Sequence, residues 1–245
     1  MSAQPATNEI VQWATEQHAK YKPSDETKQK LSRISIGMLV GPTAVGKSFL
    51  INKLTELDGR FSGMGTITTR EQRKSDPDNY SFISPDEFAA RIESGDLVQY
   101  EIHPTTGDFY GSDYDSFNSG WVIAPVLAKG LKPFKEAGFK LATPIGIVSP
   151  AKEWSERLAV HADGEDLKKR LHEALLAIEW LRGHRFNTPI LSNGSDNIDK
   201  TIEKISKLTT GNNRVHYHYA DAKINAVINE MQMTAKQKLR ELDRE

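Results

Sequence analysis

The stretch Gly41–Ser48, with the sequence GPTAVGKS, constrains this chain more than any other. It fits the phosphate-binding pattern G-x-x-x-x-G-K-[ST] at every fixed position. Glycines let the backbone curl so that successive N–H groups face phosphate oxygens, and Lys47 adds a positive charge beside the β- and γ-phosphates. Ser48 supplies a hydroxyl for Mg2+. The pattern therefore predicts a loop that binds ATP together with Mg2+.

The residues on either side of this loop support that prediction. Residues 34–40 form a short apolar run that ends at Gly41, as a buried parallel strand would. Residues 49–54 place apolar side chains at helical spacing, and no helix breaker follows before Gly59. Such a loop works between a strand and the N-terminus of a helix. The predicted cofactor-binding residues are Gly41, Pro42, Thr43, Ala44, Val45, Gly46, Lys47, Ser48 and Phe49, with Ser48 as the metal ligand.

Length and composition restrict the remaining possibilities. At 245 residues the chain can bury a sizeable core, and we expect one α/β domain with excursions. The 32 Lys and Arg residues balance 33 Asp and Glu residues, so no overall field favours nucleic acid or an anionic membrane. The absence of cysteine excludes disulfides and thiol chemistry. Because the N-terminus is polar and no apolar run approaches about 20 residues, we expect a cytoplasmic protein.

A second polar cluster follows the first predicted helix. Arg70 and Arg73 stand three residues apart behind the hydroxyl-rich run at 66–69. Guanidinium forks give bidentate contacts to phosphate, and threonine hydroxyls can add neutral donors. We expect this segment to be an exposed loop, in which two neighbouring arginines repel each other unless an anion lies between them. The cluster therefore predicts a phosphate-binding site.

Turn and capping signals organise the chain around this cluster. Residues 76–79 predict a turn, and residues 80–84 predict a short alternating strand. Ser84 followed by Pro85 predicts the start of a helix that ends at Gly95. Residues 97–102 predict another strand. Near the N-terminus, residues 9–22 predict a helix that packs on the core rather than a segment that binds a partner.

Four motifs in this order resemble the guanylate kinase family. They are the loop at 41–48, Thr-Thr-Arg-x-x-Arg at 68–73, Tyr-x-Phe-x-Ser at 80–84 and Tyr-Gly-Ser at 110–112. The similarity extends from about residue 34 to residue 208. It implies a P-loop α/β/α fold of three layers with a parallel core sheet, a small acceptor-binding subdomain and a lid. It also implies a kinase that transfers the γ-phosphate of ATP to GMP or dGMP.

The resemblance assigns roles to residues on the acceptor side. Arg70, Arg73, Tyr80 and Tyr110 correspond to the family's ligands for the acceptor phosphate. Thr66 and Ser112 fall where the family contacts the guanine base.

The base-recognising carboxylate has two candidates on this side. It is Glu101 when counted back from Tyr110 and Gln99 when counted forward from Tyr80, and both side chains belong to one strand face. We prefer Glu101, because a carboxylate accepts from both N–H donors of guanine, and we keep Gln99 as the alternative.

On the donor side, Arg157 and Arg170 match the arginines that flank the family's lid, at about residues 157–170. With Lys47 they are the predicted catalytic residues, because lid arginines neutralise charge on the transferring phosphoryl group. His161 takes the place of the arginine between them. Asn193 matches the family residue near the donor adenine.

The chain departs from the family at the end of the predicted strand 121–126. The family carries Asp-x-Asp there, whereas this chain has Ala124, Pro125 and Val126. A carboxylate near Mg2+ and the acceptor base is therefore missing or supplied from elsewhere.

We predict three parts of the chain. Residues 1–33 form an N-terminal helical extension, and residues 34–210 form the kinase domain with its acceptor-binding insertion at about 61–118. Residues 211–245 form a C-terminal helical extension, whose apolar spacing predicts either packing on its own core or a homo-oligomer. The alternation around His216 and His218 favours an edge strand over a metal site.

Three classes of function fit this pattern. The first is a kinase acting on GMP or dGMP, a small-molecule partner, with no nucleic acid and no membrane involved. The second is a related P-loop kinase with another phosphorylated acceptor, such as ribose 1,5-bisphosphate, and the missing Asp-x-Asp supports it. The third is a non-catalytic guanylate kinase-like interaction module. The intact Gly46-Lys47-Ser48 argues against the third, because a module that no longer binds ATP does not need this loop.

Overall fold

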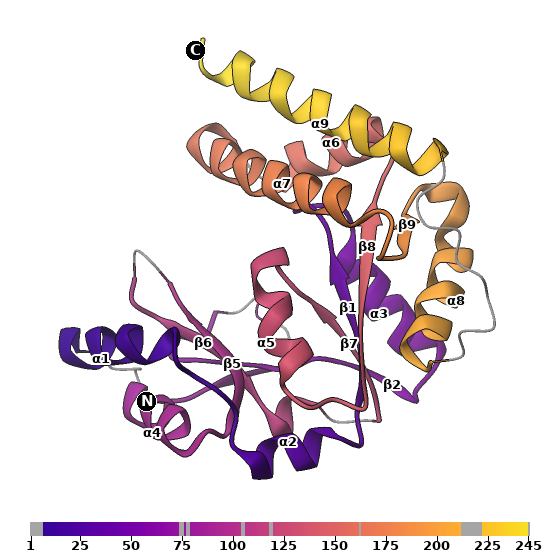
Figure 1. Ribbon diagram of the computed structural model, residues 1–245. Helices are drawn as coiled ribbons and strands as arrows, with labels where there is room; N and C mark the ends of the chain where they lie inside the picture. The colour runs from indigo at the N-terminus through magenta and orange to yellow at the C-terminus, as the bar shows by residue number, and fades with distance from the viewer. Residues whose placement is uncertain are drawn as a thin grey trace. The chain divides into compact units, whose positions relative to one another are not determined.

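A computed structural model describes residues 7–73, 76, 79–103, 106–117, 120–161, 163–211 and 222–244 (Figure 1). The strands are β1 (Ser35–Val40), β2 (Phe61–Gly63), β3 (Thr66–Thr68), β4 (Tyr80–Phe82), β5 (Leu97–Ile102), β6 (Phe109–Asp113), β7 (Trp121–Pro125), β8 (Leu141–Val148) and β9 (Ile190–Ser192). The helices are α1 (Asn8–His18), α2 (Asp25–Leu31), α3 (Lys47–Leu57), α4 (Pro85–Ser94), α5 (Leu131–Glu136), α6 (Ala151–His161), α7 (Gly164–His184), α8 (Ile198–Thr209) and α9 (Ala222–Leu242). Short 3-10 turns lie at Tyr114–Ser116, Ala128–Gly130 and Ser195–Asn197.

The chain divides into two compact units. The first contains residues 1–36, 60–122 and 132–142, and the second contains residues 37–59, 123–131 and 143–245.

A five-stranded sheet confirms the predicted α/β fold class. Its strands lie in the order β2-β7-β1-β8-β9, and β8 pairs in parallel with β9. All six residues of β1 are buried, as are the last four of β8. Such continuous apolar runs are typical of parallel strands covered on both faces. The sequence predicted β1 over 34–40, and the strand occupies Ser35–Val40.

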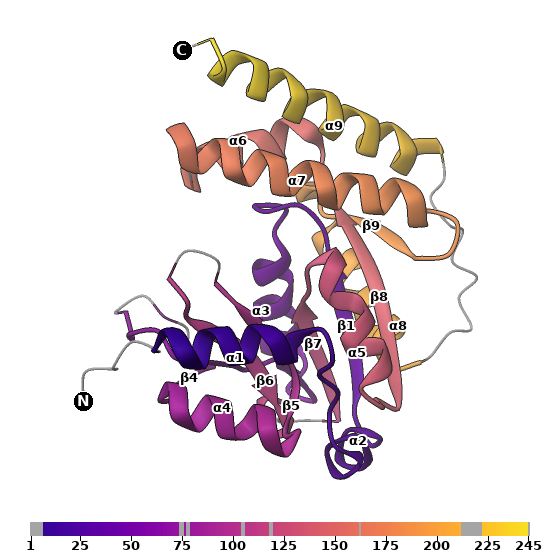
Figure 2. The ribbon, with the colours of Figure 1, turned by 60° about the vertical axis from the view of Figure 1, so that its left-hand side comes forward.

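Three helices of the second unit, α6, α7 and α9, pack together. In both ribbon views α9, drawn in yellow, lies along α7 (Figures 1 and 2). Ile228, Met231 and Ala235 are the buried residues of α9. The Arg182 guanidinium on α7 also donates a 2.6 Å hydrogen bond to Gln232 on α9. The C-terminal helix therefore packs on its own chain, while residues 215–219, with His216 and His218, lie outside the described residues.

A four-stranded sheet organises the first unit. Its order is β4-β3-β6-β5, with β3 parallel to β4 and antiparallel to β6. The strands β2 and β3 were missing from the prediction, which expected the segment with Arg70 and Arg73, behind residues 66–69, to be an exposed loop. Each is only three residues long, too short to show a period of two.

An aromatic cluster fills the space between this sheet and the helices α1 and α4. Its buried members are Ala14, Ile67, Phe88, Ile92, Leu97, Tyr100 and Phe109. The helix expected over 9–22 ends at His18, and α2, which was not predicted, follows after the capping residue Ser24. The Tyr100 hydroxyl donates a 2.7 Å hydrogen bond to the Ala14 carbonyl, so α1 is hydrogen-bonded to β5.

The start and end of α4 agree with the capping prediction. The Ser84 side chain accepts a hydrogen bond from the backbone N–H of Glu87, and Pro85 occupies the first turn. Gly95 ends the helix with φ +72°, in the left-handed region that favours glycine.

Across the described segments, no helix combines the length and apolar character needed to cross a membrane.

We expect Tyr100→Phe to lower the free energy of unfolding by about 1 to 2 kcal/mol. Tyr100 is only 2% exposed, and the change removes the hydrogen bond that its buried hydroxyl donates to the Ala14 carbonyl. Burial also raises the pKa of Tyr100 to about 12, so its hydroxyl stays a donor at neutral pH. Urea unfolding measures the change, and the exposed Tyr114→Phe serves as the control. Equal stability of the two variants would contradict this role of the hydroxyl.

Candidate active site

The loop between β1 and α3 has a backbone that only glycine allows at two points. Gly46 has φ +95°, and a Cβ atom there would lie 2.3 Å from Nδ2 of Asn193. A Cβ atom at Gly41 would lie 2.4 Å from the carbonyl oxygen of Ile147. Ala44 has a left-handed φ of +58° between them. The strand, the tight loop and the helix therefore lie where the sequence pattern predicts them.

The carbonyl groups of this loop are held by side chains of the same unit. Nζ of Lys47 donates to the carbonyls of Gly41 and Pro42, at 2.7 and 2.8 Å. Nε1 of Trp154 donates to the carbonyl of Thr43, and Nδ2 of Asn193 donates to that of Val45, both at 2.9 Å.

These contacts fix which way the peptide groups face. In a planar trans peptide the C=O and the following N–H point in opposite directions. Holding the carbonyls of residues 42, 43 and 45 therefore turns the N–H groups of residues 43, 44 and 46 away from those side chains. N–H groups oriented in this way at the start of a helix suit an anion such as phosphate.

The ammonium group of Lys47 is half-buried among these carbonyls. Burial lowers its pKa from 10.5 to about 8, and the negative charge of Glu173 opposes that shift. A bound anion such as phosphate would therefore stabilise the charged form of Lys47.

A cavity of about 810 Å3 opens beside the loop. It is lined by Thr43, Ala44, Gly46, Lys47, Ser48, Phe49, Glu153, Glu156, Arg157, Asn193, Ser195 and Ile198. The predicted residues Arg157 and Asn193 therefore lie at the loop.

Arg157 contacts its own helix and the neighbouring strand. It donates through Nε to the Glu153 carbonyl at 3.1 Å, and through a terminal nitrogen to Oγ of Ser149. Arg170 is absent from the cavity lining, and its Nε pairs instead with Asp166, one helical turn earlier, at 2.8 Å. The predicted lid is mostly helical, because α6 ends at His161 and α7 starts at Gly164. The side chain of His161 lies outside the described part of the chain.

Ser48 has a setting that fits Mg2+. Its hydroxyl is exposed in the cavity, and magnesium in nucleotide sites takes few protein ligands, with phosphate and water oxygens completing the shell. Among the described residues no group of three metal-ligating side chains occurs, and the end of β7 carries no acid. Glu153 and Glu156 are the acids of the cavity. The sequence interpretation missed them, although their spacing of three places them on one face of α6.

The first unit brings the acceptor-side residues onto neighbouring strands. Thr66 on β3 pairs with Tyr80 on β4, and Thr68 on β3 pairs with Tyr110 on β6. On β5, Glu101 pairs with Tyr110 and Gln99 pairs with Ser112 of β6.

The two candidates for base recognition have different neighbours. Nε2 of Gln99 lies 3.4 Å from Oγ of Ser112, which is itself fully buried and lies 3.7 Å from the sulfur of Met64. Glu101 is half-buried opposite Tyr110. Both stay candidates.

The expectation of an exposed loop is wrong for Arg70, whose side chain is only 10% exposed. Its guanidinium forms a bidentate pair with Asp76, at 2.8 and 2.5 Å, and lies 5.4 Å from the ring centres of both Tyr80 and Phe82. The anion beside the arginines is thus a carboxylate of the chain itself. Asp76 was interpreted from the sequence only as a turn residue. Its position three residues after Arg73 was the sequence signal that an acidic partner lies close to the two arginines.

Arg73 and Asp76 are also joined through the backbone, because the Arg73 N–H donates to Oδ2 of Asp76 at 2.6 Å. The Arg73 side chain is exposed. Hydrogen bonds from Arg70 and from the Arg73 backbone lower the pKa of Asp76 to about 2. Asp76 is therefore an anion over the whole physiological range.

Asp76 occupies only one edge of the Arg70 fork. A guanidinium has five N–H donors, and the pair with Asp76 uses the two terminal nitrogens. One terminal nitrogen also donates to the carbonyl of Glu71 at 2.8 Å, and among the residues that the structure describes Nε has no acceptor within hydrogen-bond distance. The edge formed by Nε and the nearer terminal nitrogen suits a second, side-on anion while Asp76 stays in place.

Thr68 and Thr69 do not offer their hydroxyls to a phosphate, contrary to the expectation. Both are buried, and both bond to the backbone of Phe109. Oγ1 of Thr68 donates to its carbonyl at 2.8 Å, and Oγ1 of Thr69 accepts from its N–H at 2.9 Å. The hydroxyls extend the pairing of β3 with β6 towards Arg70.

Comparison with known proteins gives consistent matches. A model of the guanylate kinase family matches residues 34–120. The guanylate kinase of Salinibacter ruber is 36% identical over 152 residues, which cover 59% of this chain and 79% of that protein. The guanylate kinase of Prochlorococcus marinus is 28% identical over 181 residues, 70% of this chain and 94% of that protein. The crystal structure of guanylate kinase from Anaplasma phagocytophilum covers 78% of this chain and 93% of its own, at 21% identity and a TM-score of 0.49.

We expect Asp76→Asn to destabilise the fold in a pH-dependent way. The folded pKa of Asp76, about 2, lies below its ordinary value of 3.8, so its contribution is complete above pH 4 and is lost as pH falls towards 2. Urea unfolding at pH 7, 4 and 2.5 should therefore show a difference between wild type and variant that shrinks with falling pH. Asp86→Asn, at an exposed acid of α4, is the control. A difference that is the same at every pH would contradict the ion pair.

Proposed function

The chain belongs to the guanylate kinase family, and from that premise we propose that it transfers the γ-phosphate of ATP to GMP or dGMP. The family makes it an ATP-dependent nucleoside monophosphate kinase. The observation that carries the proposal is the loop whose carbonyls are held by Lys47, Trp154 and Asn193, since it presents N–H groups and an ammonium ion to a triphosphate.

On the donor side, positioning and electrostatics carry the reaction. The N–H groups of residues 43, 44 and 46 bind phosphate oxygens, and Lys47 exchanges its loop carbonyls for the β- and γ-phosphates. Ser48 would hold Mg2+, which would supply charge neutralisation at the phosphates. Arg157 lines the cavity from α6, where its charge favours the transferring group. Arg170 would act only after leaving Asp166.

On the acceptor side, Arg70 binds the monophosphate through its open edge, together with Arg73, Tyr80 and Tyr110. Asp76 keeps the Arg70 guanidinium in one orientation, so little side-chain entropy is lost when the phosphate binds.

The resemblance to the family supplies the base contacts on this side, and the register of β5 and β6 places Gln99 beside Ser112 and Glu101 beside Tyr110. We propose that Thr66 and Ser112 contact the guanine base, with Glu101 as the acceptor of its N–H groups and Gln99 as the alternative.

A second candidate function is phosphorylation of another phosphorylated acceptor, such as ribose 1,5-bisphosphate. Two observations favour it. The end of β7 carries Ala124 and Pro125 instead of carboxylates, and Gln99 is engaged with Ser112 rather than open to a base.

A coupled assay of ADP release with Mg-ATP separates these functions. We expect ADP to be released with GMP and with dGMP. Lys47→Ala should lower that rate more than tenfold, because a tenfold change corresponds to only about 1.4 kcal/mol of transition-state stabilisation, too little for a residue that contacts the transferred phosphate. Release with ribose 1,5-bisphosphate alone would establish the second candidate. Release with none of the nucleoside monophosphates or sugar phosphates would favour a non-catalytic interaction module.

We expect Arg70→Lys to raise the KM of the acceptor and to lower kcat/KM by roughly 10- to 1000-fold, about 1.4 to 4 kcal/mol of transition-state binding. An ammonium group cannot hold Asp76 and a phosphate side by side as the fork does. The KM of ATP should stay within about twofold, and steady-state kinetics measure both. Arg33→Lys, at an exposed position of the same unit, is the control. Equal weakening of ATP and acceptor would place Arg70 outside the acceptor site.

We expect ATP binding to take up a proton between pH 8 and 9. The pKa of Lys47 is about 8 in the free protein, and bound phosphates raise it, so a fraction of neutral Lys47 becomes charged on binding. The apparent ATP affinity should fall as pH rises above 8. Titration calorimetry in two buffers of different ionisation enthalpy measures the uptake, which Lys47→Ala should abolish. A heat that is independent of the buffer would contradict this pKa.

Self-association through α9 stays a prediction. The buried residues of α9 are used within the chain, so a contact between subunits would rest on exposed residues such as Met233, which is 72% exposed. Sedimentation velocity of the full chain and of the Met233→Lys variant tests this prediction. We expect the full chain to sediment as an oligomer and the variant to shift towards the monomer, and a monomeric mass for both would contradict self-association.

A further inference from the structure

A groove runs between α7 and α9, apart from the donor cavity. It has a volume of about 540 Å3, within the range of small-molecule sites, roughly 300 to 1000 Å3. It is lined by Leu175, Glu179, Arg182, Gly183, Arg185, Gln232 and Lys236, none of which lines the cavity beside the phosphate loop.

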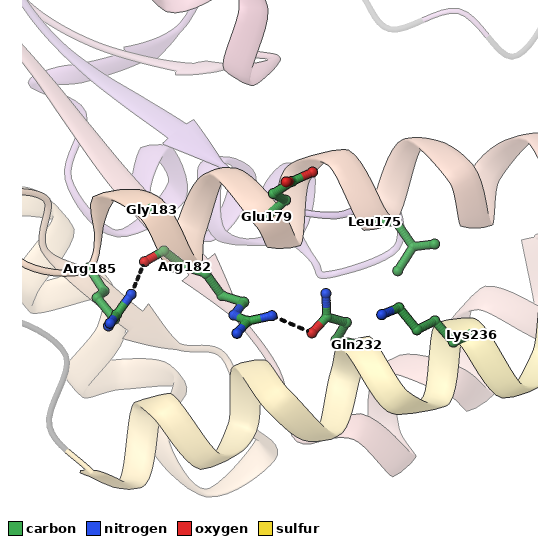
Figure 3. Close-up of a pocket in the computed structure, with 7 residues that line it drawn as sticks. All are labelled: Leu175, Glu179, Arg182, Gly183, Arg185, Gln232 and Lys236. Carbon is green, nitrogen blue, oxygen red and sulfur yellow. Dashed lines mark hydrogen bonds between the residues drawn. The ribbon is translucent and has the colours of Figure 1, made fainter.

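Positive charge collects in this groove. Its lining holds three cations and one acid, in a chain whose formal net charge is −1. Figure 3 shows Arg182, Gln232 and Lys236 directed into the space between the helices, whereas Glu179 points away from α9. The groove therefore presents cations from both of its walls.

The partners of these cations are neutral. Arg182 donates to the Gln232 amide at 2.6 Å, and Arg185 donates to the main-chain carbonyl of Arg182. Within the described residues, no carboxylate lies within ion-pair distance of Arg182, Arg185 or Lys236. Neighbouring cations that lack a carboxylate repel one another, and a bound anion relieves that repulsion.

A second, smaller cavity continues the groove towards the end of α7. Its volume is about 300 Å3, and it shares Arg182 and Arg185 with the first. Phe186 lies in its lining with its ring 66% exposed, and the Arg185 guanidinium lies 4.3 Å from the ring centre. Asn229 on α9 adds an amide. A flat aromatic surface and an amide beside a cationic groove suit a ring that carries phosphate groups.

We propose that the groove between α7 and α9 binds the polyphosphate group of a small anion, at a site distinct from the donor loop. Arg182 and Lys236 hold the phosphate oxygens from opposite walls, and Arg185 adds a third cation. Free polyphosphate and the phosphates of a nucleotide share this chemistry, and a nucleotide gains a further contact at Phe186.

Titration calorimetry with inorganic tripolyphosphate tests the site in the full chain. We expect two binding events, one at the donor loop and one at the groove. The double variant Arg182→Gln with Lys236→Gln should weaken the second event at least tenfold. The matched double variant Lys223→Gln with Arg240→Gln, at exposed residues of α9 outside both cavities, should leave it within twofold. Lys47→Ala should remove the other event and keep this one.

Two further measurements guard against misinterpretation. Arg182→Gln also removes the contact with Gln232, so Lys236→Glu alone, which keeps that contact, is needed. It should have the same thermal midpoint as wild type and should weaken tripolyphosphate binding at the groove by the same tenfold.

Titrating ATP into the Lys47→Ala chain distinguishes a nucleotide from free polyphosphate as the ligand. Binding that is tighter than that of tripolyphosphate, and that Phe186→Ser weakens, identifies a nucleotide. Equal affinities identify a site for the polyphosphate alone. A single event in wild type, or equal losses in the two double variants, would overturn the proposal.

Discussion

The donor loop depends on the hydrogen bonds that hold its carbonyl groups. A loop this tight would otherwise leave its peptide groups free to turn, and a turned peptide presents an oxygen where phosphate needs a hydrogen. Trp154 from α6 and Asn193 from the segment after β9 hold it from two sides. Residues more than a hundred positions apart in the sequence therefore set one local geometry, and the fold of the second unit determines which way the peptide groups of the loop face.

In the first unit a comparable constraint acts on the guanidinium of Arg70. Arg70 lies 5.4 Å from the ring centres of Tyr80 and Phe82 and pairs with Asp76, so contacts within the chain hold its guanidinium without a bound anion. The same pair lowers the pKa of Asp76 and keeps that carboxylate charged. A side chain that is already held in place loses less conformational entropy when an anion binds. The pair with Asp76 also occupies some of the N–H donors of Arg70, which are then not available to that anion.

The features that could be predicted from the sequence are those that short stretches of residues determine locally. The glycines of the loop, the Ser84 cap and the end of α4 at Gly95 follow from backbone sterics and capping, which short stretches encode. The strand β3, the buried threonines and the pairing of Arg70 with Asp76 were missed. Each depends on partners that the chain brings together only after folding, such as the Phe109 backbone. The conformation of the loop was thus easier to predict than the surroundings of Arg70.

The N-terminal helices lie outside the family match, which begins at residue 34, yet α1 covers the aromatic cluster over β5. Without α1, Tyr100 would lose its hydrogen bond to Ala14 and its edge contact with His18. A chain shortened to the family boundaries would therefore expose part of the aromatic cluster to solvent, and exposed apolar surface promotes aggregation. The smallest soluble fragment of this protein is accordingly larger than the unit that family membership defines, and its solubility depends on residues with no place in the chemistry.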